Sequence, residues 1–413
     1  MSLIKPVAGL RPAPGRAAEV AAPPYDVMNA AEARRIVAGR PWSFLHISRP
    51  EVDLPEGIDP YDPAVYARAR ENLDRMLAEG VLIRDPAPCY QAYRLTMGAH
   101  TQLGLVASAS VAAYDAGRIK KHEFTRPVKE DDRVRQIEAL NAQTGPVFLV
   151  YRATPAIDNV LAAVSTAPAE VDIAAADGVR HEIWTIADPD LITRLTTAFD
   201  ALDALYVADG HHRSAAASRV AAARRAANPQ HSGDESDNGF LAVIFPHDQM
   251  QILDYNRLVR DLNGYDAASF LHRLRDAFRV EPSTMPVKPM QPAEFGLYLE
   301  GHWYRLTLDP ALIPEDPVAR LDVSLLQNHL IGPILGIADP RRDERIDFVG
   351  GIRGLDGLVK RVDSGEMAVA FALYPTRMQD LMAVADAGEV MPPKSTWFEP
   401  KLADGLVSHV FDN

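Results

Sequence analysis

The sequence predicts a mixed α/β protein, and three observations support this class. Short apolar runs typical of buried strands recur along the chain, and between them lie longer segments with apolar residues at helical spacing. Turn-forming Gly, Pro, Asn and Asp separate the two kinds of segment. The hydrophobic fraction of 47% and the charged fraction of 24% are ordinary for a globular protein that buries a sizeable core.

The first half of the chain predicts, in order, helices over 31–40 and 62–80, paired strands over 90–95 and 103–113, a strand over Val147–Tyr151, a helix over 189–202 and a strand over 205–208. Helical spacing of Val65, Leu73 and Met76 supports the second helix. A turn at 97–100 joins the paired strands. Asp209-Gly210 then breaks the last strand, and an alanine-rich helix is expected from His211 to about residue 227.

After a polar loop over 228–239, the second half predicts, in order, a strand pair over 240–245 and 251–258, a helix over 266–278, a hairpin over 295–299 and 303–308, a helix over 318–335, strands over 346–349 and 367–373, and a helix over 376–386. No internal repeat is present. The expected division is a region over 1–260 and an α+β region over 261–413, with one interlocked unit as the alternative.

Charge and composition exclude several classes of protein. The 43 Lys and Arg against 56 Asp and Glu give a net charge of −13, which disfavours nucleic acid and anionic membrane surfaces as partners. No apolar run reaches the roughly 18 residues that a membrane span needs, and the first 15 residues do not resemble a secretion signal. The single cysteine, Cys89, excludes an internal disulfide and a multi-cysteine zinc site. A cytoplasmic protein that acts on a small molecule is expected.

The segment YVADGHHR (206–213) is the first candidate site, because an apolar strand turns into a helix there. Unpaired N–H groups at a helix start attract anions, and Gly210 permits close approach of a ligand. Arg213 can hold a phosphate or carboxylate with two parallel hydrogen bonds. Capping would explain Asp209, but it gives no reason for His211 and His212. Adjacent histidines point in different directions, so one metal ion held by both is not expected.

The second candidate is IKKHEFTRPVKEDDR (119–133), which combines acids, bases and cations. A solvated charged loop is the alternative interpretation. The chain has only eight lysines against 35 arginines, yet five lysines fall within this segment and the segment MPPKSTWFEPK (391–401). Where arginine is the usual cation, a lysine is more plausibly kept for its compact, titratable ammonium.

The third candidate is the segment 391–401 itself, in which two prolines precede Lys394, Ser395 and an aromatic pair. These features suit an ordered loop that lines a pocket, or equally a packed tail. PPYDV (23–27) and the DFVGG run at 347–351 are weaker candidates, because plain turn chemistry explains them too. The sequence contains no GxxxxGK[ST], GxGxxG, HExxH or GxSxG motif, so the corresponding chemistries have no support.

These motifs in this order, PPYDV, IKKHEFTRPVKEDDR, ADGHHR, RIDFVGG and MPPKSTWFEPKL, resemble the conserved family catalogued as domain of unknown function 1015. The resemblance extends over essentially the whole chain. The strand–DGHHR–helix element is in addition similar to the phosphate-binding motif of the ParB/sulfiredoxin superfamily, which includes nucleotide-binding partition proteins and archaeal free-serine kinases. This second resemblance implies a ParB/sulfiredoxin-like core with an additional mixed sheet and helices.

The same resemblance implies phosphate contacts at Gly210, His211, His212 and Arg213. Sulfiredoxins need a cysteine within the motif, where this chain has histidine, so thiol repair is not expected. Partition proteins bind DNA through an appended helical domain, which an acidic chain without a basic tract does not support. ATP or ADP with Mg²⁺ is the expected cofactor.

The favoured hypothesis is an enzyme that transfers a phosphoryl group to or from a small polar metabolite. Glu123 is the expected general base, with His122 or Asp26 second. Phosphate charge would be neutralised by the DGHHR segment and by cations and a donor from the other segments, namely Lys120, Lys121, Arg126, Lys129, Lys394 and Ser395. Possible Mg²⁺ ligands are Asp209, Asp132 and Glu130.

Serine or phosphoserine is the substrate that the kinase resemblance suggests, so a serine kinase and a phosphoserine phosphatase both stay open. A non-catalytic nucleotide-binding regulator is the alternative from another class. A third alternative is a protein that binds a metabolite carboxylate through Arg213 and Lys394, without a nucleotide.

Overall fold

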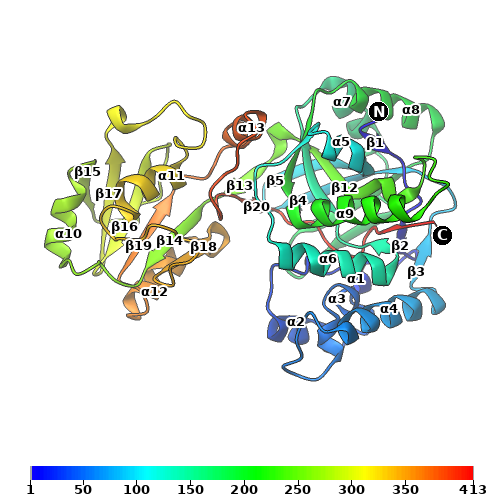
Figure 1. Ribbon diagram of the computed structural model, residues 1–413, viewed down its shortest axis with the longest axis horizontal. Coiled ribbons are helices and arrows are strands. Elements are labelled where there is room, and N and C mark those ends of the chain that lie inside the picture. Colours follow the sequence, from blue (N-terminus) through cyan, green and yellow to red (C-terminus); the bar gives the residue numbers. More distant parts are fainter. Residues whose placement is uncertain (1, 413) are drawn as a thin grey trace. The chain divides into compact units, whose positions relative to one another are not determined.

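The computed structural model describes residues 2–412 and confirms the mixed α/β class (Figure 1). The chain divides into two compact units. Unit 1 comprises Met1–Met250 and Pro400–Asn413, and unit 2 comprises Gln251–Glu399. The expected division lies after residue 260, with residues 400–413 in the second region. In the structure these last residues pair with unit 1, for example through the antiparallel ladder of His409–Val410 with Ala142–Gln143.

Unit 1 is built on a nine-stranded mixed sheet with the order β6-β11-β8-β12-β5-β4-β10-β9, in which β1 also pairs with β5. The β11–β6 and β12–β8 pairs are parallel and the remaining pairs are antiparallel. Its strands are β1 (Ile4–Lys5), β4 (Tyr90–Met97), β5 (His100–Ser110), β6 (Ile119–Lys120), β8 (Val147–Tyr151), β9 (Val171–Ala174), β10 (Arg180–Ile186), β11 (Leu205–Asp209) and β12 (Gly239–Pro246). Two short ladders pair β2 (Leu10–Pro12) with β3 (Leu82–Arg84) and β7 (Ala142–Gln143) with β21 (His409–Val410).

Nine α-helices belong to the described part of unit 1. They are α1 (Ala17–Val20), α2 (Ala30–Val37), α3 (Leu45–Ser48), α4 (Pro63–Ala78), α5 (Val111–Asp115), α6 (Pro127–Leu140), α7 (Pro155–Val164), α8 (Pro189–Asp200) and α9 (His211–Ala227). Figure 1 shows α7 and α8 at one end of the unit and α2, α3 and α4 at the other. Helices α6 and α9 pack against each other between these ends, which brings the second and the first candidate segment together.

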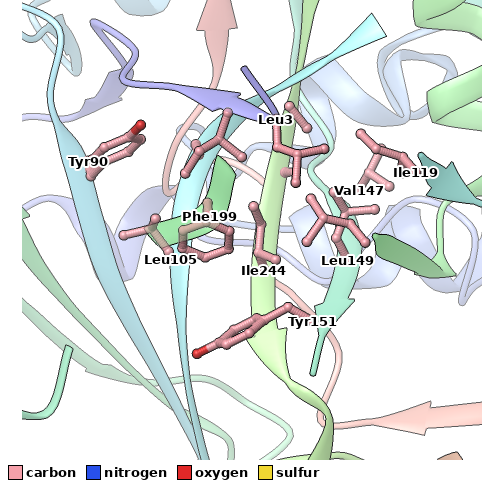
Figure 2. Packing of buried hydrophobic residues seen from close by; sticks show 14 of the residues in the cluster. Leu3, Tyr90, Leu105, Ile119, Val147, Leu149, Tyr151, Phe199 and Ile244 are labelled. Carbon is pink, nitrogen blue, oxygen red and sulfur yellow. The ribbon is translucent and has the colours of Figure 1, made fainter. Parts of the chain in front are cut away.

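The main core of unit 1 lies between the sheet and its helices (Figure 2). Strand residues such as Leu149 and Ile244 are fully buried and pack with Phe199 of α8. β8 is buried at all five positions, as expected for a central strand covered on both faces. A second cluster joins α3, α4 and β3, and a third joins α6, α9 and Phe411.

Unit 2 contains an antiparallel six-stranded sheet with the order β15-β17-β16-β19-β14-β18 and a separate two-stranded ladder of β13 with β20. Helix α12 packs on the sheet through Leu358. The strands are β13 (Gln251–Leu253), β14 (Tyr255–Val259), β15 (Phe278–Ser283), β16 (Glu294–Leu299), β17 (His302–Leu308), β18 (Ile346–Gly350), β19 (Val369–Leu373) and β20 (Trp397–Glu399), and the α-helices are α10 (Ala267–Leu274), α11 (Asp322–Leu326), α12 (Gly354–Asp363) and α13 (Met378–Asp386).

Two element predictions were wrong. The expected strand pair over 240–245 and 251–258 does not form, because β12 pairs with β5 and β8 whereas β14 pairs with β18 and β19 of unit 2. The expected helix over 318–335 is instead a single α-turn, α11, followed by a π-helical turn over Gln327–Ile331. Among the described residues, no helix combines the length and the apolar character needed to cross a membrane.

Candidate functional site

The DGHHR segment lies where β11 ends and α9 begins. Gly210 has φ +96°, a left-handed conformation that favours glycine, and no side chain caps the helix. The first N–H groups of an α-helix have no partner within the helix and carry the positive end of its dipole. The start of α9 is therefore a place where an anion is stabilised.

Arg213 lies in the first turn of α9, and its side chain is 9% exposed. It donates to the Pro146 carbonyl and lies 3.8 Å from the Asp209 carboxylate and 4.0 Å from that of Asp26. Burial alone would lower its pKa, but these carboxylates outweigh burial and raise it. The Nε atom is buried and has no hydrogen-bond partner. One donor of the guanidinium thus has no partner among the described residues.

Asp404, from the C-terminal segment, is buried beside this arginine. It lines a cavity of about 30 Å³ together with Tyr25, Arg133 and Arg213, enough for one or two water molecules. Burial raises the pKa of Asp404 to about 7, although Arg213 opposes the shift. Its Oδ2 atom has no hydrogen-bond partner. Arg213 and Asp404, each with one polar atom that has no hydrogen-bond partner, therefore line the same small cavity.

Lys401 holds the carboxylate of Asp209, with Nζ 3.1 Å from Oδ2. Burial opposes ionisation of Asp209, but Lys401 and Arg213 outweigh it and lower its pKa well below the ordinary value. Asp209 is accordingly a paired carboxylate in the structure.

The segment 119–133 forms β6, a loop and the first half of α6. Pro127 is the first residue of α6, where the missing N–H of proline costs nothing. In the loop, the Arg126 N–H donates to Nε2 of His212 at 3.1 Å. Since Nε2 accepts this bond, the proton of a neutral His212 ring is on Nδ1. The two candidate segments are joined at this bond.

The side chains of His122, Glu123 and His211 form one cluster. The two imidazole rings are perpendicular with centroids 4.5 Å apart, and Glu123 Oε2 lies 3.8 Å from His211 Nδ1. One potential ligand atom from each residue lies within 4.8 Å of the other two. Both histidines are buried, whereas the Glu123 side chain is 45% exposed.

Burial makes these histidines weak bases. It lowers the pKa of His122 to about 4 and that of His211 well below its ordinary value, the latter with a contribution from neighbouring His122. Burial and Arg126 also lower the pKa of His212. All three imidazoles are neutral near pH 7; the lone pair of His212 accepts from Arg126, whereas His122 and His211 can each offer one to a ligand.

The cations of the segment 119–133 lie near aromatic rings. Lys121 Nζ is 4.4 Å from the ring centre of Tyr114, Lys129 Nζ is 5.5 Å from that of Tyr61, and Lys120 Nζ is 6.0 Å from that of Tyr206. Lys120 pairs in register with Tyr206 across the β6–β11 ladder, so it lies beside the DGHHR strand.

Two of the expected metal ligands have other partners. Asp132 accepts a hydrogen bond from Tyr66 at 2.9 Å and forms an ion pair with Arg133. Glu130 accepts from Thr125 and from Arg219. Among the described residues, the group whose ligand atoms lie close enough for one ion is His122, Glu123 and His211. Ligation of Mg²⁺ by Asp209, Asp132 and Glu130 stays a prediction that this geometry disfavours.

Lys394 and Ser395 belong to unit 2. Lys394 has φ +60°, its carbonyl accepts from the buried Arg257 at 3.0 Å, and its Nζ lies 5.6 Å from the ring centre of Tyr255. Ser395 donates to the Pro392 carbonyl at 2.6 Å and is buried. The segment 391–401 thus includes an ordered, packed loop, and its role in a phosphate site stays a prediction.

Sequence reasoning missed four residues that surround Arg213 and Asp209, namely Tyr25, Arg133, Lys401 and Asp404. Asp404 lies almost 200 residues after Arg213 in a short AspGly turn, which by itself indicates only a turn. The signals that were present are the scarcity of lysine, which points to Lys401, and the position of Tyr25 next to Asp26 in PPYDV.

Comparison with known proteins gives one family and several distant structural similarities. The chain is similar to a conserved hypothetical protein from Pyrococcus furiosus, with 14% identity, a TM-score of 0.35 and coverage of 73% of this chain and 94% of that one. It is also similar to a free serine kinase in complex with AMP (13% identity, TM-score 0.34, coverage 73% and 92%) and to SbnI with C-terminal truncation from Staphylococcus aureus (11%, 0.37, 73% and 86%). No curated protein matches.

The family model described as protein of unknown function (DUF1015) matches residues 4–324, more than half of the chain. The matched region contains Asp26, the segment 119–133 and the DGHHR segment that meet in unit 1. The chain therefore belongs to the DUF1015 family.

Proposed function

We propose that unit 1 binds the phosphate groups of ATP or ADP at the start of α9 and transfers a phosphoryl group to the hydroxyl of a small polar metabolite. The observation that carries the proposal is the pair of buried, unsatisfied nitrogen atoms in the first turn of α9, Arg213 Nε and His211 Nε2. A buried polar atom without a partner is costly in a native protein, so it indicates a bound molecule or water.

The charges around this turn favour an anionic ligand over a neutral one. Arg213 is positively charged at every physiological pH, and the helix dipole adds to its field. The left-handed turn at Gly210 leaves room for the Arg213 guanidinium, because an added Cβ would lie 3.0 Å from Arg213 Nε. Lys120, which pairs with Tyr206 of β11 in the parallel β6–β11 ladder, supplies a second cation on the neighbouring strand.

For chemistry, the site also needs a group that accepts the proton of the attacking hydroxyl. Glu123 is our choice, because its carboxylate is half exposed and lies 3.8 Å from His211. Asp26 is second, because its side chain is 40% exposed and its carboxylate lies 4.0 Å from Arg213. His122 is third, because burial leaves it inaccessible to a substrate.

Serine is the first acceptor to test, because the DGHHR element resembles that of free-serine kinases. The reaction breaks the bond between the transferred phosphorus and the bridging oxygen of the nucleotide and forms a bond from that phosphorus to the serine hydroxyl oxygen. The hydroxyl proton passes to Glu123. Mg²⁺ enters with the nucleotide as part of the substrate.

Phosphorus NMR of the purified protein with ATP or ADP, Mg²⁺ and serine tests this proposal, with phosphoserine alone as the reverse substrate. Formation of phosphoserine would support the kinase, and release of phosphate from phosphoserine would support the phosphatase. Spectra that remain unchanged in both reactions would overturn the enzymatic proposal. Broadened nucleotide lines without turnover would favour the non-catalytic regulator.

Two variants separate catalysis from binding. Glu123→Gln should reduce turnover by about 100-fold or more, the usual contribution of a general base, while nucleotide affinity changes less than threefold. Arg213→Lys keeps the charge but loses the planar fork, so it should weaken nucleotide binding about tenfold or more. Equal turnover in wild type and Glu123→Gln would contradict the role of Glu123.

A further inference from the structure

We infer that His122, Glu123 and His211 form a binding site for a divalent first-row transition metal ion, of the kind that Zn²⁺, Fe²⁺ and Co²⁺ occupy. The proposal goes beyond phosphoryl transfer, because it gives Glu123 and His211 a second role as ligands of a resident metal ion. It rests on three features of the described residues, which are the ligand types, the geometry and the unsatisfied nitrogen atoms.

The ligand types are two imidazoles and one carboxylate. This set suits Zn²⁺, Fe²⁺ and Co²⁺, whereas Mg²⁺ and Ca²⁺ prefer oxygen ligands throughout. The site therefore differs in kind from the carboxylate set of Asp209, Asp132 and Glu130 that was expected for Mg²⁺. Because only the histidine site offers nitrogen ligands, experiment can distinguish a transition metal ion bound there from Mg²⁺ bound by the carboxylates.

The geometry needs only small side-chain movements. Two atoms bound to one tetrahedral ion at about 2.1 Å lie roughly 3.4 Å apart. Glu123 Oε2 and His211 Nδ1 are 3.8 Å apart, and the chosen atoms of all three residues lie within 4.8 Å of one another. His211 begins α9, whereas His122 and Glu123 lie in the short loop between β6 and α6.

The unsatisfied atoms are His122 Nδ1 and His211 Nε2, each buried and without a hydrogen-bond partner. His122 makes a hydrogen bond with the Val207 carbonyl, and Nε2 is the ring nitrogen left to donate it. This bond fixes the tautomer that presents the Nδ1 lone pair, an arrangement typical of metal-ligating histidines. A metal ion would satisfy His122 Nδ1 and would bind His211 through Nδ1, which lies 3.8 Å from Glu123 Oε2, so His211 Nε2 would remain for the phosphate of the proposed function.

Three protein ligands leave a coordination position open, as in catalytic rather than structural zinc sites. A carboxylate has two oxygen atoms, so ligation by one oxygen of Glu123 leaves the other to accept a proton. If the proposed function is correct, the open position faces the phosphate-binding turn, because His211 is the first residue of that turn. This last step rests on the proposed function, whereas metal binding itself does not.

The experiment is titration of the metal-free, full-length protein with Co²⁺ and then Zn²⁺, in the absence of nucleotide and serine. We expect one equivalent of Co²⁺ to bind and to show the visible d–d absorption bands of Co²⁺ held by nitrogen and oxygen ligands. Zn²⁺ should displace the Co²⁺ and remove these bands. Excess Mg²⁺ should leave the bands unchanged. Because no substrate is present, failure of metal binding and failure of phosphoryl transfer are separate results.

Variants identify the ligands. Glu123→Gln and His211→Phe should each weaken Co²⁺ binding at least tenfold, whereas His181→Phe should not. His181 is a matched control, because it is also buried in unit 1 and its Nδ1 is already hydrogen-bonded to Tyr93 at 2.7 Å. Glu123 is half exposed, so its variant should fold even if a buried histidine variant does not. Wild-type binding below one equivalent, equal binding by Glu123→Gln, or displacement of Co²⁺ by Mg²⁺ would each overturn the proposal.

Discussion

The backbone N–H of Arg126 donates a hydrogen bond to Nε2 of His212, 86 positions further along the chain. This contact joins the loop before α6 to the first turn of α9. Helices α6 and α9 pack together below it through Ile137, Ala216 and Val220. The apolar packing places the two helices, and the hydrogen bond then fixes the loop that carries His122 and Glu123.

Replacing His212 with Phe should loosen this loop while α9 remains folded. A hydrogen bond contributes about 1 kcal/mol, so protection of the Arg126 amide against hydrogen exchange should fall roughly fivefold. Hydrogen exchange followed by NMR or mass spectrometry measures this change. His231→Phe is the control, since its side chain pairs locally with Glu235 in another loop. Unchanged protection at Arg126 would show that the bond does not hold the loop.

The regular elements were more predictable from sequence than the partners of the site. The strand–turn–helix at DGHHR follows from an apolar run, a glycine and an alanine-rich segment, and the structure confirms β11 and α9. Local patterns of this kind depend on neighbouring residues only. The start of α6 at Pro127 was not assigned, because charged residues masked its weak helical pattern.

The partners of Arg213 could not be predicted, because they come from long-range contacts. Nothing in the sequence around Asp404 shows that it returns to unit 1 and meets Arg213 and Tyr25. The erroneous strand pair over 240–245 and 251–258 has the same origin. Adjacent strands in sequence often pair, but here the chain leaves one unit for the other between them.

Replacing Gly210 with Ala should weaken phosphate binding more than it weakens the fold. The added Cβ would need a left-handed backbone, which costs about 1–2 kcal/mol, and it would lie 3.0 Å from Arg213 Nε. Arg213 must then move away from the position that it now occupies. Isothermal titration with inorganic phosphate or ADP should show at least a tenfold loss of affinity.

Gly178→Ala is the matched control for this change. Gly178 has φ +84° in a turn, and nothing lies within 4 Å of its added Cβ. Gly178→Ala should therefore lose about 1–2 kcal/mol of stability through backbone strain, while its affinity for phosphate or ADP stays unchanged. Similar ligand affinities for the two variants would contradict a role of the Gly210 turn.

Replacing Lys401 with Met should destabilise unit 1 more than the same change at Lys5. Both ammonium groups lie 3.1 Å from an aspartate oxygen, but the Lys401–Asp209 side chains are 20% and 33% exposed, against 58% and 89% for Lys5 and Asp234. Loss of a partly buried charged pair should cost about 1–2 kcal/mol, and loss of an exposed pair should cost less than about 0.5 kcal/mol. Urea unfolding at pH 7 measures both values, and equal costs would contradict the importance of the Asp209 pair.

Asp404 should make the stability of the protein depend on pH between about 4 and 7. Burial raises its pKa from 3.8 to about 7, so in this range the folded state binds a proton that the unfolded state has released. Stability from this group is complete below pH 4 and is lost as the pH rises through 7. Above pH 7 the buried carboxylate is ionised at a cost on the order of 4 kcal/mol.

Asp404→Asn tests this dependence, because the amide has nearly the shape of the protonated carboxyl and cannot ionise. The free energy of unfolding of the variant minus that of the wild type should rise from pH 4 to about 7 and then level off. Other buried groups, such as Asp322 in unit 2, are present in both proteins and cancel in the difference. Asp412→Asn, at an exposed pair with Arg84, should give a difference that is nearly flat over this range. A flat difference for Asp404→Asn as well would mean that Arg213 keeps the carboxylate ionised throughout, and a falling difference would mean that the ion pair outweighs burial.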